Sequence, residues 1–216
     1  MKHFRFIICF ELAILLTVSS GVVAQDLKPI QLPAPQTEIG KPLMQALKLR
    51  QSIREYSTKK LPLQEISNLL WAAWGINRQE SGLRTAPSAS NRQEIDIYAI
   101  IEDGIYRYNA QANTIEQFLA GDMRSLAGRQ DWIKMAPLNL LFIADLTKMG
   151  GSSREGKIVT ASADAGFISQ NVYLYCASQG LATVVRGGFN RKELSKAMNL
   201  GPDQYITYAQ TVGYPK

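Results

Sequence analysis

Two arginines and a serine alternate at the end of a predicted helix, and their side chains have the chemistry of a phosphate-binding site. They are Arg50, Ser52 and Arg54. Residues two apart share a face only in an extended chain, so these side chains converge if the helix ends near Leu49. A guanidinium that makes two parallel hydrogen bonds, together with a hydroxyl donor, suits a phosphate monoester. An ordinary exposed segment shows the same pattern, so both interpretations stay open at this point.

A loop of small polar residues is the second candidate. Residues 78–93 show no periodicity and end in the sequence PSASNRQ, residues 87–93. Small side chains let backbone groups approach a flat ligand, while Asn and Gln side chains can hold the loop's own backbone. A long loop in a compact domain is usually functional, although this one also reads as a plain polar loop.

The third candidate lies in and after a long apolar helix predicted over residues 159–179. This helix carries Asp164-Ala165-Gly166 and Gln170-Asn171, and Gly187-Gly188-Phe189 follows it. A glycine inside a helix costs about 1 kcal/mol relative to alanine, so we expect something to pack closely against Gly166.

The residues that the chain lacks exclude whole reaction classes. The single histidine, His3, and one of the two cysteines, Cys9, lie in the first twenty residues, which read as an export signal. Without them no imidazole is left for Ser-His-Asp or Cys-His catalysis or for His-ligated zinc, and Cys176 has no partner for a disulfide. We therefore predict no metal site, and chemistry supplied by a bound cofactor.

The N-terminus has the features of a secretory signal peptide. Lys2 and Arg5 precede a mostly apolar stretch, residues 6–18, and Val22-Val23-Ala24 resembles a signal-peptidase site. We predict cleavage of residues 1–24 and export to the periplasm or medium. A membrane anchor is the competing interpretation, but a span needs about 20 apolar residues and this stretch is shorter, so we predict no stable anchor.

The charge of the chain favours a solvated surface over a nucleic-acid partner. The formal net charge is +6, and loss of the signal peptide lowers it by one. No run of five or more basic residues occurs, and we predict no nucleic-acid binding.

The remaining elements predict one α+β domain over residues 43–216, preceded by an extended proline-containing arm over residues 25–42. Helices are expected from Leu43, after Pro62 up to Gly75, and at 159–179 and 192–198. Strands are expected near 95–100, 105–108, 114–119, 137–144, 181–185 and 205–212, and residues 147–157 read as a mobile loop. Helices and strands mix without βαβ regularity, which indicates α+β.

The order of these segments resembles the nitroreductase-like FMN oxidoreductases, most closely the SagB-type, azoline dehydrogenase-like branch. The matching pieces span residues 30–215 and are RQSIREY, PLQEISNLLWAAWGI, RTAPSASNRQEIDIYAI, DAGFISQNVYLYCASQGLATVVRGGF and TVGYP. The resemblance implies a central, mostly antiparallel sheet flanked by helices, and a homodimer with swapped elements and two FMN sites at the subunit interface. It does not imply azoline oxidation, because Ser152-Ser153 stands where those enzymes carry a Lys-Tyr pair.

The resemblance also implies roles for individual residues. Arg50 and Ser52 match phosphate ligands, and Arg54 matches the group near the N1/O2 edge of the flavin ring. Pro87, Ser88 and Ala89 match a loop that reaches across from the other subunit, and Gly187 and Gly188 match the backbone beside N5. Gln130 is a fainter match to a ring-contacting amide, and Lys216 is the only candidate for a C-terminal phosphate ligand. The implied FMN-binding set is Arg50, Gln51, Ser52, Arg54, Pro87, Ser88, Ala89, Asn91, Gln130, Gly187, Gly188 and Lys216.

The function implied is hydride or electron transfer through bound flavin to or from a small organic substrate, such as a nitroaromatic or a quinone. The flavin carries the chemistry, and the cation of Arg54 would favour the reduced, anionic ring. No catalytic acid or base is identified, because tyrosines such as Tyr106, Tyr108, Tyr173 and Tyr175 are expected in strands and core.

The electron donor stays open. NAD(P)H is the usual reductant of the family and would serve in the cytoplasm, but it is scarce outside, and the chain has no Gly-x-Gly-x-x-Gly motif. The alternative from a non-enzyme class is an exported protein that binds or scavenges flavin without turnover.

Overall fold

A computed structural model describes residues 29–151 and 153–216. The predicted signal peptide, residues 1–24, and the first part of the predicted arm, residues 25–28, lie outside the described residues. The rest of the arm runs without helix from residue 29 to 42 and contributes a short strand, β1.

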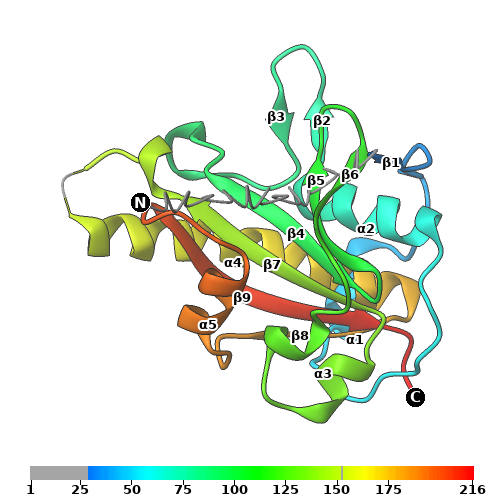
Figure 1. The fold of residues 1–216 in the computed structure, drawn as a ribbon. Helices are drawn as coiled ribbons and strands as arrows, with labels where there is room; N and C mark the ends of the chain where they lie inside the picture. Colours follow the sequence, from blue (N-terminus) through cyan, green and yellow to red (C-terminus); the bar gives the residue numbers. More distant parts are fainter. Residues whose placement is uncertain (1–28, 152) are drawn as a thin grey trace, which may run out of the picture.

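A seven-stranded sheet forms the centre of the molecule (Figure 1), and all of its strand pairs are antiparallel. The spatial order is β1-β6-β5-β4-β7-β9-β8. The strands are β1 (Ile30–Gln31), β4 (Ile95–Ile101), β5 (Gly104–Asn109), β6 (Thr114–Ala120), β7 (Leu138–Asp145), β8 (Ala182–Arg186) and β9 (Gln204–Gly213). The predicted α+β fold with a mostly antiparallel sheet is confirmed.

Helices cover both faces of this sheet. They are α1 (Leu43–Leu49), α2 (Leu63–Trp74), α3 (Asp131–Met135), α4 (Arg154–Gln179) and α5 (Arg191–Ala197), with 3₁₀ turns η1 (Ala89–Asn91), η2 (Arg124–Ala127) and η3 (Leu146–Lys148). In Figure 1, α2 and α4 lie behind the sheet, and α3 and α5 lie in front of it.

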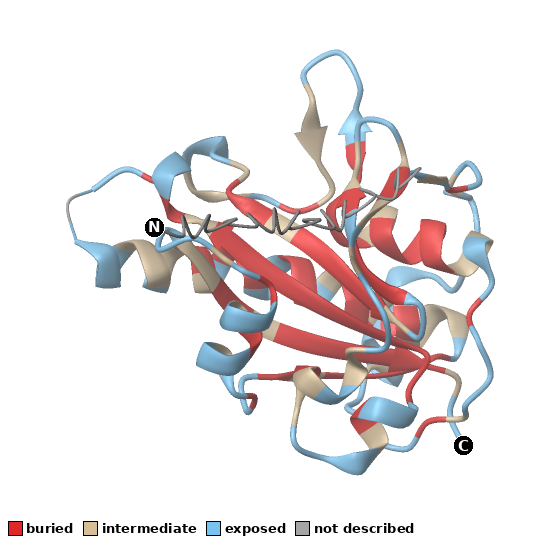
Figure 2. Ribbon diagram, in the orientation of Figure 1, coloured by how far each residue is buried: buried red, intermediate tan, exposed pale blue. Residues whose placement is uncertain are grey.

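Alternation along the strands builds a separate apolar layer on each face. Ile97 and Ala99 of β4 pack into the layer under α2 and α4, and Tyr98 and Ile100 pack into the layer under α5. The buried residues in Figure 2 follow the central strands and the inner sides of these helices. Strand β7, buried over residues 138–144, has the continuous apolar sequence of a strand covered on both faces.

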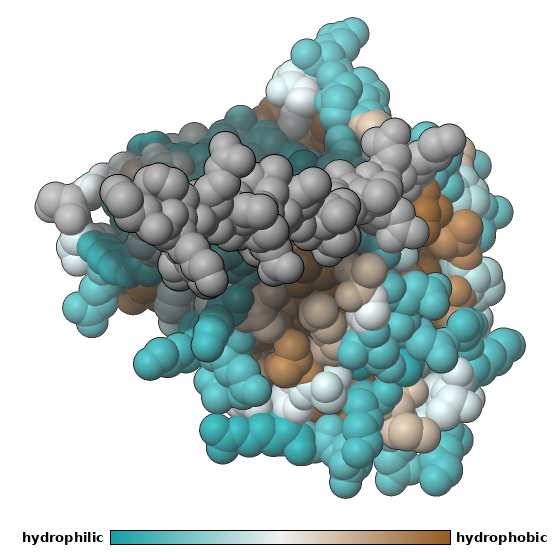
Figure 3. Space-filling view, viewed as in Figure 1, coloured by the Kyte–Doolittle hydropathy of each residue, from teal (hydrophilic) through white to brown (hydrophobic). Residues whose placement is uncertain are grey.

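Figure 3 shows the front face, on which hydrophilic side chains occupy the rim and apolar ones gather between α5 and the hairpin of β5 and β6. No helix among residues 29–151 and 153–216 is long and apolar enough to cross a membrane.

Two predicted loops contain regular structure. The predicted loop at 78–93 contains β3 (Leu83–Arg84), which pairs with β2 (Ile76–Arg78) at the start of the loop, and the turn η1. The sequence does not reveal the β2–β3 pair because it is short and its register shifts. The predicted loop at 147–157 is shorter than expected. Ser153 Oγ accepts a hydrogen bond from the N–H of Gly156, so α4 begins at Arg154, in a polar turn that shows no apolar periodicity.

The expectation that something packs closely against Gly166 is wrong for this chain taken alone. A Cβ atom built on Gly166 would meet no described atom within 4 Å. The neighbouring Phe167 is 49% exposed. The side of α4 that carries Gly166 and Phe167 therefore faces away from the chain's own core, whereas Ala165 and Ile168 are buried in it.

Candidate functional site

The segment that follows α1 lies along the free edge of β8. Helix α1 ends at Leu49, as predicted, and β8 is the last strand of the sheet, so its outer edge has no strand beside it. The N–H of Ile53 donates to the carbonyl of Thr183 at 3.0 Å, and Tyr56 forms a bridge with Pro215. These contacts hold residues 50–56 extended, in the conformation that alternate side chains need to share a face.

Ser52 and Arg50 both contact Tyr173 of α4. The Oγ of Ser52 lies 2.8 Å from the Oη of Tyr173, which accepts the N–H of Val185 at 3.0 Å. The guanidinium of Arg50 lies 5.5 Å from the centre of the Tyr173 ring. The sequence indicated a core tyrosine, and Tyr173 is 7% exposed, with its hydroxyl in hydrogen-bond distance of Ser52.

Arg54 and Lys216 line one cavity of about 740 Å³, together with Tyr56 and Trp132. The two aromatic rings stack with their centres 5.6 Å apart. Arg50 does not line this cavity. Lys216 and Arg50 were both expected to bind the phosphate, but Lys216 lies with Arg54 instead. Gln51, between the two arginines, is exposed.

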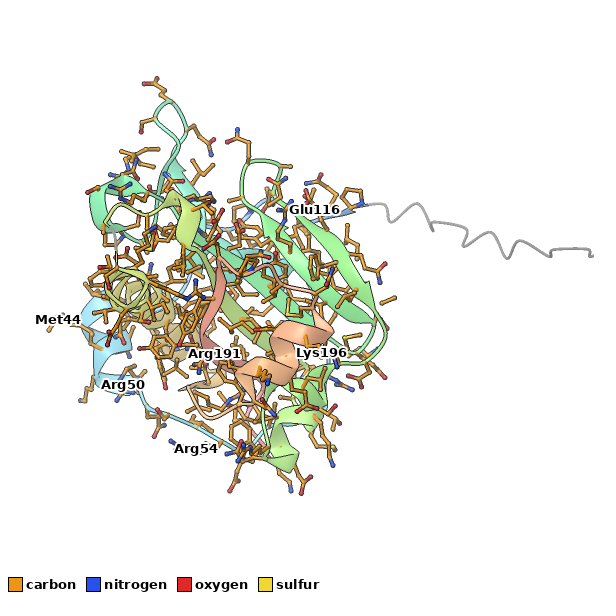
Figure 4. All side chains as sticks on the ribbon, turned by 60° about the vertical axis from the view of Figure 1, so that its left-hand side comes forward. Met44, Arg50, Arg54, Glu116, Arg191 and Lys196 are labelled. Atoms are coloured by element: carbon orange, nitrogen blue, oxygen red, sulfur yellow. The ribbon has the colours of Figure 1, made fainter. Side chains whose placement is uncertain are left out.

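Neither Arg50 nor Arg54 forms an ion pair with a described carboxylate. In Figure 4 both side chains project from the same side of the molecule, with Met44 of α1 nearby. The segment therefore carries two arginines that form no ion pair with a described carboxylate, and the hydroxyl of Ser52 lies between them in the sequence.

Gly187 and Gly188 follow β8 directly and are exposed. A Cβ atom at either position would meet nothing within 4 Å, and neither residue has a positive φ. Neither packing inside the described chain nor backbone strain explains these glycines. Gln130 is exposed at the start of α3, the helix whose Trp132 lines the cavity.

Arg186, the last residue of β8, is a buried cation that the sequence analysis missed. Its guanidinium donates to the carbonyl of Ala127, to Asn139 Oδ1 at 3.1 Å and to Thr211 Oγ1 at 2.9 Å, and lies 5.6 Å from the ring centre of Trp132. Burial lowers its pKa to about 10, so it stays protonated at neutral pH. A strand-end arginine before two glycines gives no sequence signal of burial.

The loop of Pro87, Ser88, Ala89 and Asn91 lies at a different place along α4. The N–H of Ala89 donates to Asp164 Oδ2 at 2.8 Å, and Ser88 Oγ accepts the N–H of Gln93 at 3.0 Å. Asp164 and Tyr173 are nine residues apart, which is about 13.5 Å along a helix axis. Within one chain, the loop and the Arg50–Arg54 segment are therefore well separated.

The backbone of this loop is strained. Ser90, Asn91 and Gln93 all have φ near +50°, a conformation that L-residues rarely adopt. Side-chain bonds hold it, including that of Gln93 Nε2 to the carbonyl of Gly82 at 3.1 Å.

Glu94, which directly follows the loop, is a buried acid that the sequence analysis also missed. It is fully buried, and neither carboxylate oxygen has a donor among the described residues. Burial and the neighbouring Asp164 carboxylate raise the pKa of Glu94 to about 7, opposed by the cation of Lys148. No cluster of His, Cys, Asp and Glu that could hold a metal occurs in residues 29–151 and 153–216.

Comparison with known proteins settles the family. The family model described as "Nitroreductase family" matches residues 47–214. The chain belongs to the nitroreductase family. This confirms the resemblance drawn from the motifs at the family level, and it identifies the protein as an oxidoreductase of a flavin-binding kind.

Individual relatives support this assignment. A nitroreductase-family protein of Methanocaldococcus jannaschii is 31% identical over 161 residues, 70% of this chain and 81% of that protein. A crystal structure from Ralstonia eutropha JMP134, also of the nitroreductase type, is 42% identical, covers 87% of this chain and 90% of that chain, and has a TM-score of 0.82.

A structure from Desulfovibrio desulfuricans, described as a nitroreductase in complex with FMN, shares the fold. It is 22% identical, covers 81% of this chain and 87% of that chain, and has a TM-score of 0.60.

Proposed function

We propose that this protein is an FMN-dependent oxidoreductase that passes electrons through bound flavin to or from a small organic molecule, with a nitroaromatic or a quinone as the acceptor class. The observation that carries the proposal is the donor set at the edge of β8. Unpaired Arg50 and the hydroxyl of Ser52 share a face at the start of an extended segment, and Arg54 follows on that segment.

These residues fit a phosphate-bearing, flat cofactor. The guanidinium of Arg50 offers donors and Ser52 offers a hydroxyl to the phosphate, and the open backbone of Gly187 and Gly188 leaves room for a ring. When bound, FMN would supply the hydride and electron chemistry.

The chain's own residues bind and polarise the cofactor. Arg50 and Ser52 hold the phosphate, and Arg54 lies further along the same segment, at the cavity that Lys216 shares. Arg186 adds a second positive charge beneath Trp132, in a buried setting where it is weakly screened. The cations of Arg54 and Arg186 both favour negative charge on a bound flavin ring.

We further propose that the working form is a homodimer. The exposed apolar residues of α1 and α4 are Leu43, Met44, Leu47, Leu49, Val159 and Phe167. Gly166, beside which there is open space, lies next to Phe167 in the same helix. We propose that a second copy of this chain packs against these apolar residues. Because the Ala89 loop is about 13.5 Å along α4 from Tyr173, we expect one flavin to meet that loop from the other subunit.

Export is proposed from the sequence alone, and it leaves NAD(P)H as the donor only for protein that stays in the cytoplasm. An exported form needs another reductant.

The test is the visible spectrum of purified protein incubated with FMN. A flavin band that bleaches with dithionite and returns on addition of a nitroaromatic or quinone supports the oxidoreductase. A bound flavin that no such acceptor reoxidises under anaerobic conditions favours the flavin-binding protein without turnover. A colourless protein after incubation contradicts both.

A further inference from the structure

The hydroxyl of Tyr173 connects three elements that meet at the edge of β8. It accepts the N–H of Val185 in β8, it lies within hydrogen-bond distance of Ser52, and it belongs to α4. We propose that Tyr173 is a positioning residue that fixes the hydroxyl proton of Ser52 outward, so that Ser52 donates to a phosphate monoester. The inference rests on the proposed function.

The proton count gives the direction of the bond between Tyr173 and Ser52. A backbone N–H can only donate, so Val185 uses the Tyr173 oxygen as an acceptor. The single phenolic proton then has one hydroxyl within reach, Ser52 Oγ at 2.8 Å. With Ser52 accepting this proton, its own O–H is free to donate elsewhere.

The opposite direction would leave the phenolic proton of Tyr173 without an acceptor. Apart from Ser52 and Val185, no described residue makes a hydrogen bond with the Tyr173 hydroxyl. Tyr173 is 7% exposed, and an unpaired donor in such a setting is costly.

The backbone N–H of Val185 holds the hydroxyl of Tyr173 at the edge of β8. Strand β8 is the edge of the sheet, and the Val185 N–H would be unpaired on its outer side. Tyr173 satisfies it, which anchors the phenol oxygen at a backbone position. The same ring lies 5.5 Å from the Arg50 guanidinium, so one side chain orders both predicted phosphate ligands.

A consequence is selectivity for groups that only accept hydrogen bonds. The dianionic phosphate of FMN is such a group, whereas riboflavin ends in a hydroxyl that is itself a donor. Tyr173→Phe keeps the ring and its burial but removes the proton that directs Ser52. We expect it to weaken FMN binding roughly 2- to 13-fold, the ratio that corresponds to one neutral hydrogen bond, and to leave riboflavin binding unchanged.

The experiment measures dissociation constants of FMN and riboflavin for apoprotein by fluorescence quenching. The variants are wild type, Tyr173→Phe, Ser52→Ala and the double variant. Tyr175→Phe is the matched control, because Tyr175 lies two residues further along α4 and its hydroxyl bonds to Glu65 instead. We expect Tyr173→Phe to lower the FMN-to-riboflavin preference in the wild-type background and not in the Ser52→Ala background, and Tyr175→Phe to leave the preference unchanged.

Three results would overturn the inference: an equal loss for both flavins, an unchanged preference, or the same loss of preference in the absence of Ser52. A second measurement separates it from the proposed function. If wild type binds neither flavin, the proposed function fails. Thermal unfolding with inorganic phosphate then decides the inference, which stands if phosphate raises the melting temperature of wild type more than that of Tyr173→Phe, and falls otherwise.

Discussion

The backbone N–H of Ala89 donates to Oδ2 of Asp164, joining residues 75 positions apart in the sequence at 2.8 Å. This bond ties the strained loop to the middle of α4, and the buried carboxyl group of Glu94 lies beside it. The loop conformation is therefore tied to an acidic side chain of α4 that lies far from it in the sequence.

Replacing Asp164 by alanine should destabilise the protein. The substitution leaves the Ala89 N–H without its acceptor, which costs about 1–3 kcal/mol. Urea unfolding of Asp164→Ala and wild type measures this. Asp203→Asn is a suitable control, since Asp203 is exposed and makes only a 3.7 Å ion pair with Arg154. A loss for Asp164→Ala no larger than for the control would show that the bond does not hold the loop.

Stability should fall as the pH rises through neutrality. The folded-state pKa of Glu94 is raised to about 7, above its ordinary value of 4.5, so the folded protein binds an extra proton between these values. The stabilisation is complete below about pH 4.5 and is lost as the pH passes through about 7. We expect Glu94→Gln, which carries no titrating group, to flatten this part of the curve. Urea midpoints at half-unit intervals from pH 5 to 8.5 measure it, and an unchanged slope in Glu94→Gln would assign the dependence to another group.

Replacing Arg50 by alanine should weaken FMN binding by roughly 10- to 150-fold, because a hydrogen bond to a charged group contributes about 1.5–3 kcal/mol. Riboflavin lacks the phosphate, and its affinity should hardly change. Arg78→Ala removes an exposed arginine of β2 and is the control for the loss of charge alone. Equal losses for both flavins would assign Arg50 a structural role.

The mature protein should begin at Gln25. Lys2 and Arg5, the apolar stretch after them and Val22-Val23-Ala24 predict cleavage after Ala24. Intact mass spectrometry of protein from the exporting cell measures the N-terminus. A mature product that keeps residues 1–24 would contradict export and restore NAD(P)H as a donor.

The sequence predicted the fold where apolar periodicity is strong. Strand β7 and helices α2 and α4 were all found, because each carries an apolar pattern of sufficient length. The β2–β3 pair and α3 were missed, since elements of two to five residues show no period.

The candidate site was partly visible for a related reason. Exposed polar motifs such as Arg50-x-Ser52 stand out from their neighbours. Tyr173, Arg186 and Glu94 do not, because their function depends on which distant backbone or side-chain groups their polar atoms reach. Tyr173 of α4 meets Val185 of β8, and Glu94, just before β4, meets Asp164 of α4 only after folding.

The central claim is that two copies of this chain share each FMN. Sedimentation velocity of the FMN-loaded protein, recorded across a dilution series at both the protein and the flavin wavelengths, tests it most directly. If the account is right, FMN release and dimer dissociation coincide on dilution, and added FMN lowers the dimer dissociation constant by mass action. A monomer that keeps its flavin on dilution would contradict the shared site.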